Sequence, residues 1–397
     1  MGDSSEEYLI QVLGKVALQW EMETWFHEKQ TFPNIAQNYF GLIIPAILNG
    51  KRKGKPICLQ LVLKLAPTDE RYRVSGAVTI FFAREIFVYT NILPKYREIR
   101  GKINSLSEFI IPECYYLNKD YCKEVIVMQN MCADGYVPFV SDSVLDIEHM
   151  ILSMKCLAHF HALSFIMKAQ NAHLYETAKA TCVPLSRRVN ERFFIVLLDR
   201  MNKAINTFSN TKFTPILERL ERDCDIFVEA IFKSVNRTVL CHGDIWKENL
   251  LFKYKDGVPI SVCMIDYQTT RMSSPAYDVL FLIITSTTEK LRKQYYGQLL
   301  DIYYETLEQI LLESQIPTDK MYSRPMFDND LQIVGPASFI IANTAIWLSS
   351  GLQQEGYVRS KIVLKTEKQK ELAIELYKNR ISNILDDLRS YGYLKDM

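Results

Sequence analysis

The sequence lacks the features of a secreted or lipid-anchored protein. Residues 1–10 are polar and acidic, without the basic and then apolar build of a secretory signal. Nine cysteines are scattered without a Cys-x-x-Cys pair, which argues against a metal site or a disulfide framework. Glu6 stands where a myristoylation pattern needs Ser or Thr. We therefore expect a cytoplasmic protein with reduced thiols.

The chain also lacks an excess of charge of either sign. Lys and Arg total 47 and Asp and Glu total 46, which does not indicate a nucleic-acid partner. The segment Leu331–Gln354 has no charged residue at all. It contains Gln332, Pro336 and Asn343, which are unfavourable in hydrocarbon. We interpret it as a buried helix and expect no contact with a membrane.

Hydrophobic periodicity divides the chain into a strand-rich front and a helical remainder that begins near Asp146. Apolar residues make up 48% of the 397 residues, enough for a large core. The elements expected in the front are a hairpin of Tyr39–Leu48 and Ile57–Leu65 with a basic tip that opens at Asn49-Gly50 and runs through Lys51, Arg52, Lys53 and Lys55, a helix with Phe82, Ile86, Tyr89 and Leu93 on one face that stops at Pro94, and strands at Phe109–Ile111 and Val125–Met128. This division predicts two lobes with a ligand-binding cleft between them.

A second predicted hairpin brings three polar side chains together. The apolar runs Leu250–Tyr254 and Ile260–Ile265 flank an Asp-Gly turn. Asn249 enters the first strand and Asp266 leaves the second, so closure of the hairpin places them side by side. Asp244 lies on the loop that leads to the same point. We expect these three residues to form one site.

Two carboxylates and a carboxamide at one point suit a hard cation and phosphoryl transfer. One carboxylate can accept the proton of an attacking hydroxyl, and the other two groups can hold Mg²⁺ on nucleotide phosphates. The spacing of Asp244 and Asn249 matches the Asp-x-x-x-x-Asn of kinase catalytic loops. In the alternative reading, Asp244 only caps a turn and Asp266 only ends a strand. The surrounding pattern favours the kinase interpretation.

The front part of the chain contains two residues that could bind the nucleotide phosphates. Lys64 ends a predicted strand, and Glu85 falls on the apolar stripe of the predicted helix. A carboxylate there is costly to bury unless it is paired. A strand Lys paired with a helix Glu is how kinases hold the α- and β-phosphates. Either residue alone is more often solvated, but the downstream motif favours the pair.

Two features of protein kinases are missing. No Gly-x-Gly-x-x-Gly precedes Lys64, and the interval from Asp266 to Asp278 is too short for an activation segment with its Ala-Pro-Glu end. A peptide substrate would lack its docking platform. We therefore expect a small-molecule acceptor rather than a protein.

The chain resembles the insect ecdysteroid kinase-like family, which has a choline-kinase-like (CHK) domain and is related to aminoglycoside phosphotransferases. The resemblance covers about Asn34–Leu388 and keeps its order through both lobes. Its marks are Asn38-Tyr39, Val62–Lys64, Phe82–Glu85 with Tyr89 and Pro94, Leu157–Ala162, His242–Trp246 with Asn249, Ile265–Gln268 and Ser274–Asp278.

The resemblance implies an α+β, two-lobed protein-kinase-like fold. Its parts would be a helical lead-in (1–33), a small β-rich N-lobe with one key helix (34–128), a hinge (129–133) and a large, mainly α-helical C-lobe (134–397). The implied activity is transfer of the γ-phosphoryl group of ATP, with Mg²⁺, to a hydroxyl of an apolar metabolite such as an ecdysteroid or a hydroxylated xenobiotic.

The resemblance also implies a role for each site residue. Asp244 is the catalytic base, and Asn249 and Asp266 are the Mg²⁺ ligands. Lys64 contacts the α- and β-phosphates, and Glu85 orients Lys64. The remaining nucleotide-binding residues are Asn38, in the phosphate-covering turn, and Gln129 and Met131, in the hinge around adenine. Outside the nucleotide site, Asp278 braces the catalytic loop and His161 is a packed core residue.

This sequence departs from the family pattern at three places without losing a catalytic group. Ala36-Gln37 replaces Gly-Glu, Gln129-Asn130 replaces Glu-Asp in the hinge, and Glu248 replaces a common Asn. The alternatives left open are a choline- or amine-type kinase and an inactive kinase-like binding protein. Trp246 and the charge-free segment favour an acceptor pocket with apolar walls, although such residues also fill ordinary cores.

Overall fold

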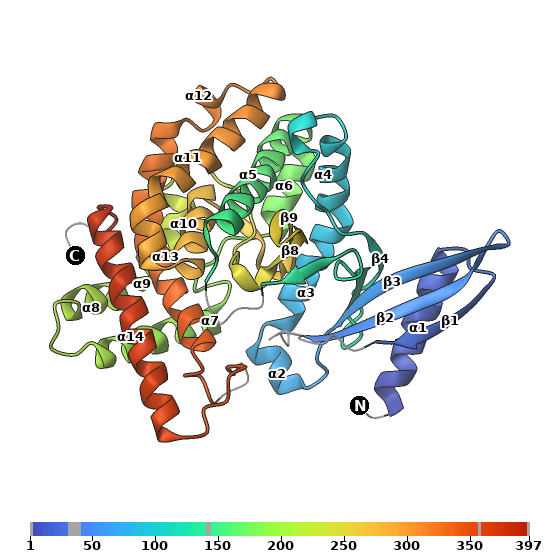
Figure 1. Ribbon diagram of the computed structural model, residues 1–397, viewed down its shortest axis with the longest axis horizontal. Helices are drawn as coiled ribbons and strands as arrows, with labels where there is room; N and C mark the ends of the chain where they lie inside the picture. The colour runs from blue at the N-terminus through green and yellow to red at the C-terminus, as the bar shows by residue number, and fades with distance from the viewer. Residues whose placement is uncertain (1–2, 31–40, 140–143, 356–358, 395–397) are drawn as a thin grey trace.

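The computed structural model describes residues 3–30, 41–139, 144–355 and 359–394. A five-stranded sheet lies at one end of the molecule and most of the helices lie at the other, as expected for an α+β, two-lobed kinase-like fold (Figure 1). The sheet has the order β1-β2-β3-β5-β4 and is antiparallel throughout. Its strands are β1 (Thr24–Lys29), β2 (Leu42–Arg52), β3 (Lys55–Leu65), β4 (Cys114–Asn118) and β5 (Val125–Gln129).

The turn of the β2–β3 hairpin lies within the expected basic tip, but the two strands extend further into that tip than the sequence predicts. Asn49 and Gly50 lie inside β2, opposite Cys58 and Ile57. The turn is at Lys53-Gly54, where both residues have positive φ angles of 50° and 71°. That conformation matches the twist of the flanking strands, and Arg52 pairs with Lys55 across it. The predicted hairpin is confirmed and its turn lies within the expected basic tip, but the tip does not open at Asn49-Gly50, because those two residues still pair within the sheet.

The helix of the front part does not stop at Pro94. After α2 (Glu70–Ser75), α3 (Val78–Phe87) runs through a π-helical turn, Val88–Ile92, into α4 (Leu93–Arg100). Pro94 lies in the first turn of α4. A proline has no N–H to complete an α-helical bond, but it is tolerated in a first turn. The π turn lets the chain restart there, so the predicted stop at Pro94 was wrong.

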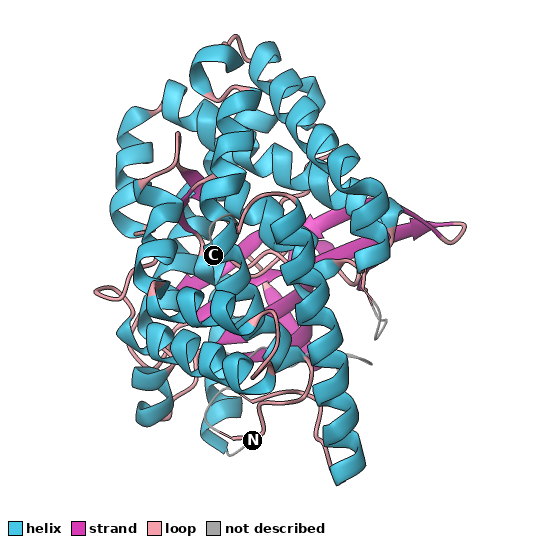
Figure 2. Cartoon of the chain, turned by 90° about the vertical axis from the view of Figure 1, so that its left-hand side faces the viewer, coloured by secondary structure: helices cyan, strands magenta, loops and turns pink. Residues whose placement is uncertain are grey.

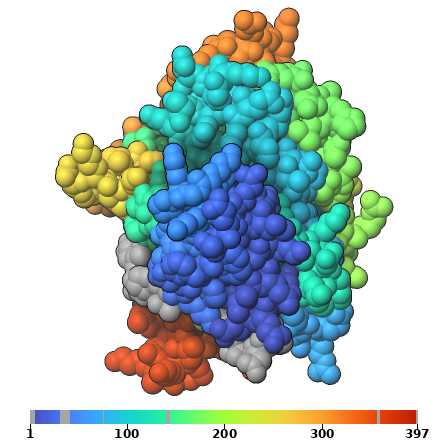
Figure 3. Space-filling model, turned by 90° about the vertical axis from the view of Figure 1, so that its right-hand side faces the viewer, coloured from blue at the N-terminus to red at the C-terminus, as the bar shows by residue number. Residues whose placement is uncertain are grey.

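Two further segments of the front differ from expectation. Phe109–Ile111 is not a strand, because β4 begins only at Cys114; the buried Phe109 ring instead contacts His159 and Phe160. The expected lead-in contains α1 (Asp3–Gln19) and also the edge strand β1. α1 packs on the sheet through Leu13 and other apolar residues, and this N-terminal segment faces the viewer in Figure 3.

The rest of the chain is mainly helical (Figure 2). The helices are α5 (Ile147–Gln170), α6 (Ala172–Thr181), α7 (Glu191–Thr207), α8 (Thr214–Arg222), α9 (Cys224–Lys233), α10 (Pro275–Ser286), α11 (Glu289–Glu313), α12 (Thr318–Met321), α13 (Arg324–Ser349) and α14 (Glu367–Ser390). Short strands lie among them: β6 (Tyr136–Pro138), β8 (Leu250–Lys255) and β9 (Val258–Met264) form one sheet, and β7 (Val239–Cys241) pairs with β10 (Arg271–Ser273). One large apolar cluster fills the space between these helices.

The charge-free segment largely coincides with α13, which packs against α10, α9 and α7. Two stretches, Ile147–Gln170 and Thr318–Ser349, are long and apolar enough to cross a membrane by length and composition. Of their most apolar windows, 83% and 67% are buried inside the protein. Both are accounted for as helices of the core.

Candidate active site

The segment His242–Asp244 connects β7 to the β8–β9 hairpin through a tight bend. Gly243 has a φ of +85°, and a Cβ atom there would lie 2.4 Å from the Thr269 carbonyl oxygen. Only glycine satisfies both conditions. The hydroxyl of Thr269 donates to the carbonyl oxygen of His242 at 3.0 Å. The close approach of these two segments fixes the path of the chain immediately before Asp244.

Asp278, at the start of α10, holds the same bend from inside the core. Its carboxylate accepts hydrogen bonds from the backbone N–H groups of His242 at 2.7 Å and Gly243 at 3.0 Å. His161 of α5 lies 3.2 Å from the carboxylate and 2.8 Å from the Tyr303 hydroxyl. Burial alone would raise the pKa of Asp278, but the hydrogen bond and charge of His161 lower it. An ionised Asp278 is therefore available to accept both N–H groups.

The β8–β9 hairpin closes as the sequence predicts and brings Asn249 to Asp266. Leu250 pairs with Met264, and the Ile265 N–H donates to the Asn249 carbonyl oxygen at 3.1 Å. The Asn249 side-chain amide donates to the backbone oxygen of Asp244 at 2.8 Å and approaches its carboxylate at 3.4 Å. Asp266 adopts a left-handed conformation with a φ of 66°. Such strain is characteristic of functional positions.

Lys64 connects the sheet to this hairpin. Its ammonium donates to Glu85 of α3 at 2.6 Å, to Asp266 at 2.8 Å and to Gln268 at 3.1 Å. Burial by itself lowers the pKa of Lys64, but the charges of Asp266 and Glu85 outweigh it and raise this pKa. Burial raises the pKa of Glu85 to about 7, against the opposing effect of Lys64. The cluster is a desolvated cation held by carboxylates from two parts of the fold.

The carboxyl group of Asp244 titrates near neutrality. Burial, followed by the charge of Asp266, raises its pKa to about 7, while Arg271 acts in the opposite direction. A carboxylate with this pKa is well matched to proton transfer at neutral pH. Two oxygen-bearing side chains, Asn249 and Asp266, lie beside it, and such oxygens are the ligands that Mg²⁺ prefers. The arrangement can therefore combine a base with a hard-cation site.

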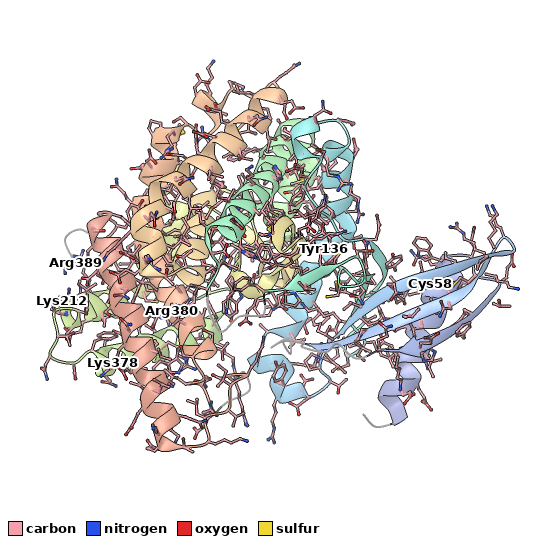
Figure 4. All side chains as sticks on the ribbon, viewed as in Figure 1. Cys58, Tyr136, Lys212, Lys378, Arg380 and Arg389 are labelled. Carbon is pink, nitrogen blue, oxygen red and sulfur yellow. The ribbon has the colours of Figure 1, made fainter. Side chains whose placement is uncertain are left out.

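The predicted hinge residues occupy different environments. The Gln129 side chain donates to Asp134 at 2.6 Å and accepts from the Glu113 N–H at 3.0 Å. Met131 is buried with Tyr136, Leu251 and Cys263 in a small apolar cluster, which Ile265 contacts. Tyr136 marks this region in Figure 4, between the sheet and the helices. Met131 thus offers an apolar surface beside the hairpin, whereas the Gln129 side chain is committed to local bonds.

Asn38, and with it Ala36 and Gln37, lies outside the described residues. No role was predicted for Gln268 from the sequence, although its side-chain amide oxygen accepts a hydrogen bond from the Lys64 ammonium. Arg271, which lies against Gly243, was also missed, because no motif includes it. The Gln268 contact could have been suspected from its position just after Asp266. Arg271 gave no such signal.

Comparison with known proteins gives one strong match and several weak ones. No curated protein is significantly similar to this chain. Solved structures with a similar chain course include the spectinomycin phosphotransferase APH(9)-Ia in complex with ADP and spectinomycin, at 12% identity and a TM-score of 0.43, covering 95% of this chain and 98% of that one. The choline kinase LicA of Streptococcus pneumoniae has 11% identity and a TM-score of 0.34, covering 95% and 99%.

The family assignment does not depend on those low scores. A sequence model of the ecdysteroid kinase-like family matches residues 36–315, which is more than half of the chain. The match includes the sheet strands β2–β5, the Lys64 cluster, the bend at Gly243 and the β8–β9 hairpin. The chain is a member of the ecdysteroid kinase-like family.

Proposed function

We propose that the protein is an ATP- and Mg²⁺-dependent kinase that phosphorylates a hydroxyl group of a small apolar metabolite, such as an ecdysteroid or a hydroxylated xenobiotic. The observation that carries the proposal is the contact of Lys64 with both Glu85 and Asp266. It joins a phosphate-binding cation to the residue that would hold the metal. Asp244 and Asn249 stand next to that residue.

In this proposal each residue of the candidate active site has one role. Lys64 binds the α- and β-phosphates, and Glu85 keeps its ammonium in place. Asn249 and Asp266 would hold Mg²⁺, which supplies positive charge to the phosphates when bound. Asp244 accepts the proton of the acceptor hydroxyl. The hydroxyl oxygen bonds to the γ-phosphorus of ATP while the bond between the γ-phosphorus and the bridging oxygen breaks and releases ADP.

The adenine base is proposed to lie against Met131 and the neighbouring apolar side chains of β8 and β9. Because the Gln129 side chain is engaged with Asp134 and Glu113 and its backbone N–H donates to the Glu113 carbonyl oxygen at 2.8 Å, we assign only its backbone carbonyl group to nucleotide binding. Asn38 keeps its proposed place in the phosphate-covering turn. We further propose that the protein acts in the cytoplasm.

The acceptor is the least constrained part of the proposal. Trp246 follows Asp244 closely and is buried. An apolar acceptor can gain about 25 cal/mol for each square ångström of apolar surface that it buries. Charged contacts are not required for such binding. A choline-type acceptor and an inactive binding protein remain the two competing functions.

The test is a phosphorylation reaction with ATP and Mg²⁺ in which an ecdysteroid and choline compete, with both products measured by mass spectrometry. Transfer to the steroid supports the full proposal. Transfer to choline alone would reject the apolar acceptor while keeping the kinase. If neither accepts phosphate and a wider panel of hydroxylated compounds also fails, although the protein binds ATP, the inactive binding protein is favoured.

A further inference from the structure

A cavity lies beside the candidate active site, between α3 and the segment that leads into α7. Its volume is about 60 Å³. These elements can be located in Figure 1. The lining side chains that bear charge are Arg84 of α3 and Arg271 of β10; no carboxylate lies among the described residues that line it. The other walls are mostly apolar, from residues such as Ile80, Leu185 and Phe193.

Both arginines are buried without a matching anion. Arg84 is 7% exposed and Arg271 is 5% exposed. Nε of Arg84, and Nε and Nη2 of Arg271, have no hydrogen-bond partner within the described parts of the chain. By contrast, Arg187, which lies in the same segment as the cavity-lining residue Leu185, forms a bidentate pair with Asp225, in which Nε donates to Oδ1 and Nη2 donates to Oδ2. The unpaired state of Arg84 and Arg271 is therefore a local property of the cavity.

The few contacts of Arg271 do not neutralise it. One guanidinium nitrogen donates to the Thr269 carbonyl oxygen at 3.3 Å, and the group stacks over the Tyr277 ring at 5.0 Å. Asp244 and Asp278 are near enough for Arg271 to lower their pKa values, but neither forms an ion pair with it. Two buried cations facing one cavity are costly unless an anion compensates them.

We propose that this cavity is a binding site for a small oxyanion: a carboxylate, sulfate or phosphate group held by Arg84 and Arg271. Guanidinium groups match the planar or tetrahedral oxygens of such anions. The cavity has room for a group of that size but not for a whole metabolite, whose apolar body could only extend along the rim. The site is separate from the proposed nucleotide site and does not depend on kinase activity.

The geometry also places the anion next to the catalytic bend. A Cβ atom on Gly243 would lie 2.6 Å from Nη1 of Arg271, so the guanidinium packs directly on the residue before Asp244. A bound anion would hold this guanidinium in place. The site can therefore receive the acid group of a metabolite, or a free anion, close to the proposed base.

Thermal unfolding without nucleotide tests the site, with sodium sulfate compared with sodium chloride at equal ionic strength. Binding to the folded state raises Tm in a saturable manner, whereas the general effect of sulfate on proteins rises without saturation. We expect a saturable component in the wild type. It should be lost in Arg84→Gln and Arg271→Gln and retained in Arg188→Gln, which removes an exposed arginine of the same segment.

Arg84→Met gives a second readout if Arg271→Gln does not fold. Because it removes a buried cation that lacks a partner, its Tm in chloride should equal or exceed that of the wild type. A wild type without a saturable sulfate response, or an Arg84→Gln variant that responds like the wild type, would overturn the proposal.

The source of the anion can be distinguished by competition against bound sulfate. The two competitors are a hydroxylated steroid carboxylic acid and its methyl ester. Displacement by the acid but not the ester identifies the acid group of a metabolite as the occupant. Sulfate binding that neither compound disturbs identifies a free oxyanion.

Discussion

The Lys64 ammonium and the Glu85 carboxylate lie 2.6 Å apart, and their side chains are only 2% and 1% exposed. Removing one member of such a pair leaves an uncompensated charge in the core. We expect Lys64→Met to lower the free energy of unfolding by about 3–5 kcal/mol at pH 8. Chemical denaturation of variant and wild type measures the difference.

The loss in Lys64→Met should become smaller below pH 7. The pKa of Glu85 is already raised to about 7 by burial, so acid neutralises the orphaned carboxylate and removes its desolvation cost. The same denaturation at pH 5 measures this effect. An equal loss at both pH values would mean that Glu85 is not the uncompensated charge.

Asp244→Asn should lower kcat by about 10²–10⁴-fold, the usual contribution of a general base, and leave ATP affinity nearly unchanged. The amide introduced by this substitution cannot accept the hydroxyl proton, but it keeps the size of the original side chain. Asp256→Asn, at the exposed turn of the β8–β9 hairpin, is the matched control and should keep full activity. Unchanged turnover in Asp244→Asn would remove Asp244 from the base role.

ATP binding should depend on Mg²⁺ in the wild type and lose that dependence in Asp266→Ala, because the metal needs the oxygens of both Asp266 and Asn249. Nucleotide affinity is followed by calorimetry across a Mg²⁺ titration. The variant also removes a partner of Lys64, so its fold must be checked by circular dichroism. Superimposable titrations of the two folded proteins would contradict the metal assignment.

The rate should fall on the acid side of about pH 7. The base acts as a carboxylate, and the pKa of Asp244 is raised to about 7, chiefly by burial; lowering the pH below that value protonates it. The measurement is kcat/KM for ATP against pH, which reports groups of the free enzyme. Activity that stays constant down to pH 5 would show that no such group controls the reaction.

Alanine substitutions at two glycines can distinguish backbone strain from steric clash at the bend before Asp244. Gly243 and Gly257 have similar φ angles of +85° and +80°, but only at Gly243 would a Cβ meet other atoms within 4 Å. Gly257→Ala should therefore cost about 1–2 kcal/mol, the conformational term alone. Gly243→Ala should cost clearly more and reduce activity. Equal unfolding free energies for the two variants would show that the bend at Gly243 can relax.

Local patterns in the sequence were sufficient to predict the β8–β9 hairpin, since an Asp-Gly turn between two apolar runs determines its closure and hence the meeting of Asn249 with Asp266. The presence of Glu85 on an apolar stripe likewise predicted a buried partner. The hairpin tip was expected to open at Asn49-Gly50, which is a strong local turn signal, but pairing across the sheet keeps these two residues in β2 and leaves the turn at Lys53-Gly54. The predicted stop at Pro94 was wrong because the π turn at Val88–Ile92 precedes α4, so Pro94 lies in the first turn of that helix, where proline is tolerated.

The cavity between Arg84 and Arg271 could not have been predicted, since the two residues come from distant parts of the chain and no sequence motif pairs them; Arg84 lies within the Phe82–Glu85 mark, but nothing there indicates its contact with Arg271. The same is true of the three helices that meet around Asp278. Tertiary packing alone brings such groups together.

The hydrogen bonds from His242 and Gly243 to Asp278 have a consequence for the motions of the protein. Asp278 is fully buried and is linked through His161 and Tyr303 to α5 and α11. The amide protons of His242 and Gly243 can exchange with solvent only when that helical core opens, so they belong to its most slowly exchanging class. The segment before Asp244 is accordingly a fixed platform, and any opening that admits an acceptor must come from the parts of the protein that surround it.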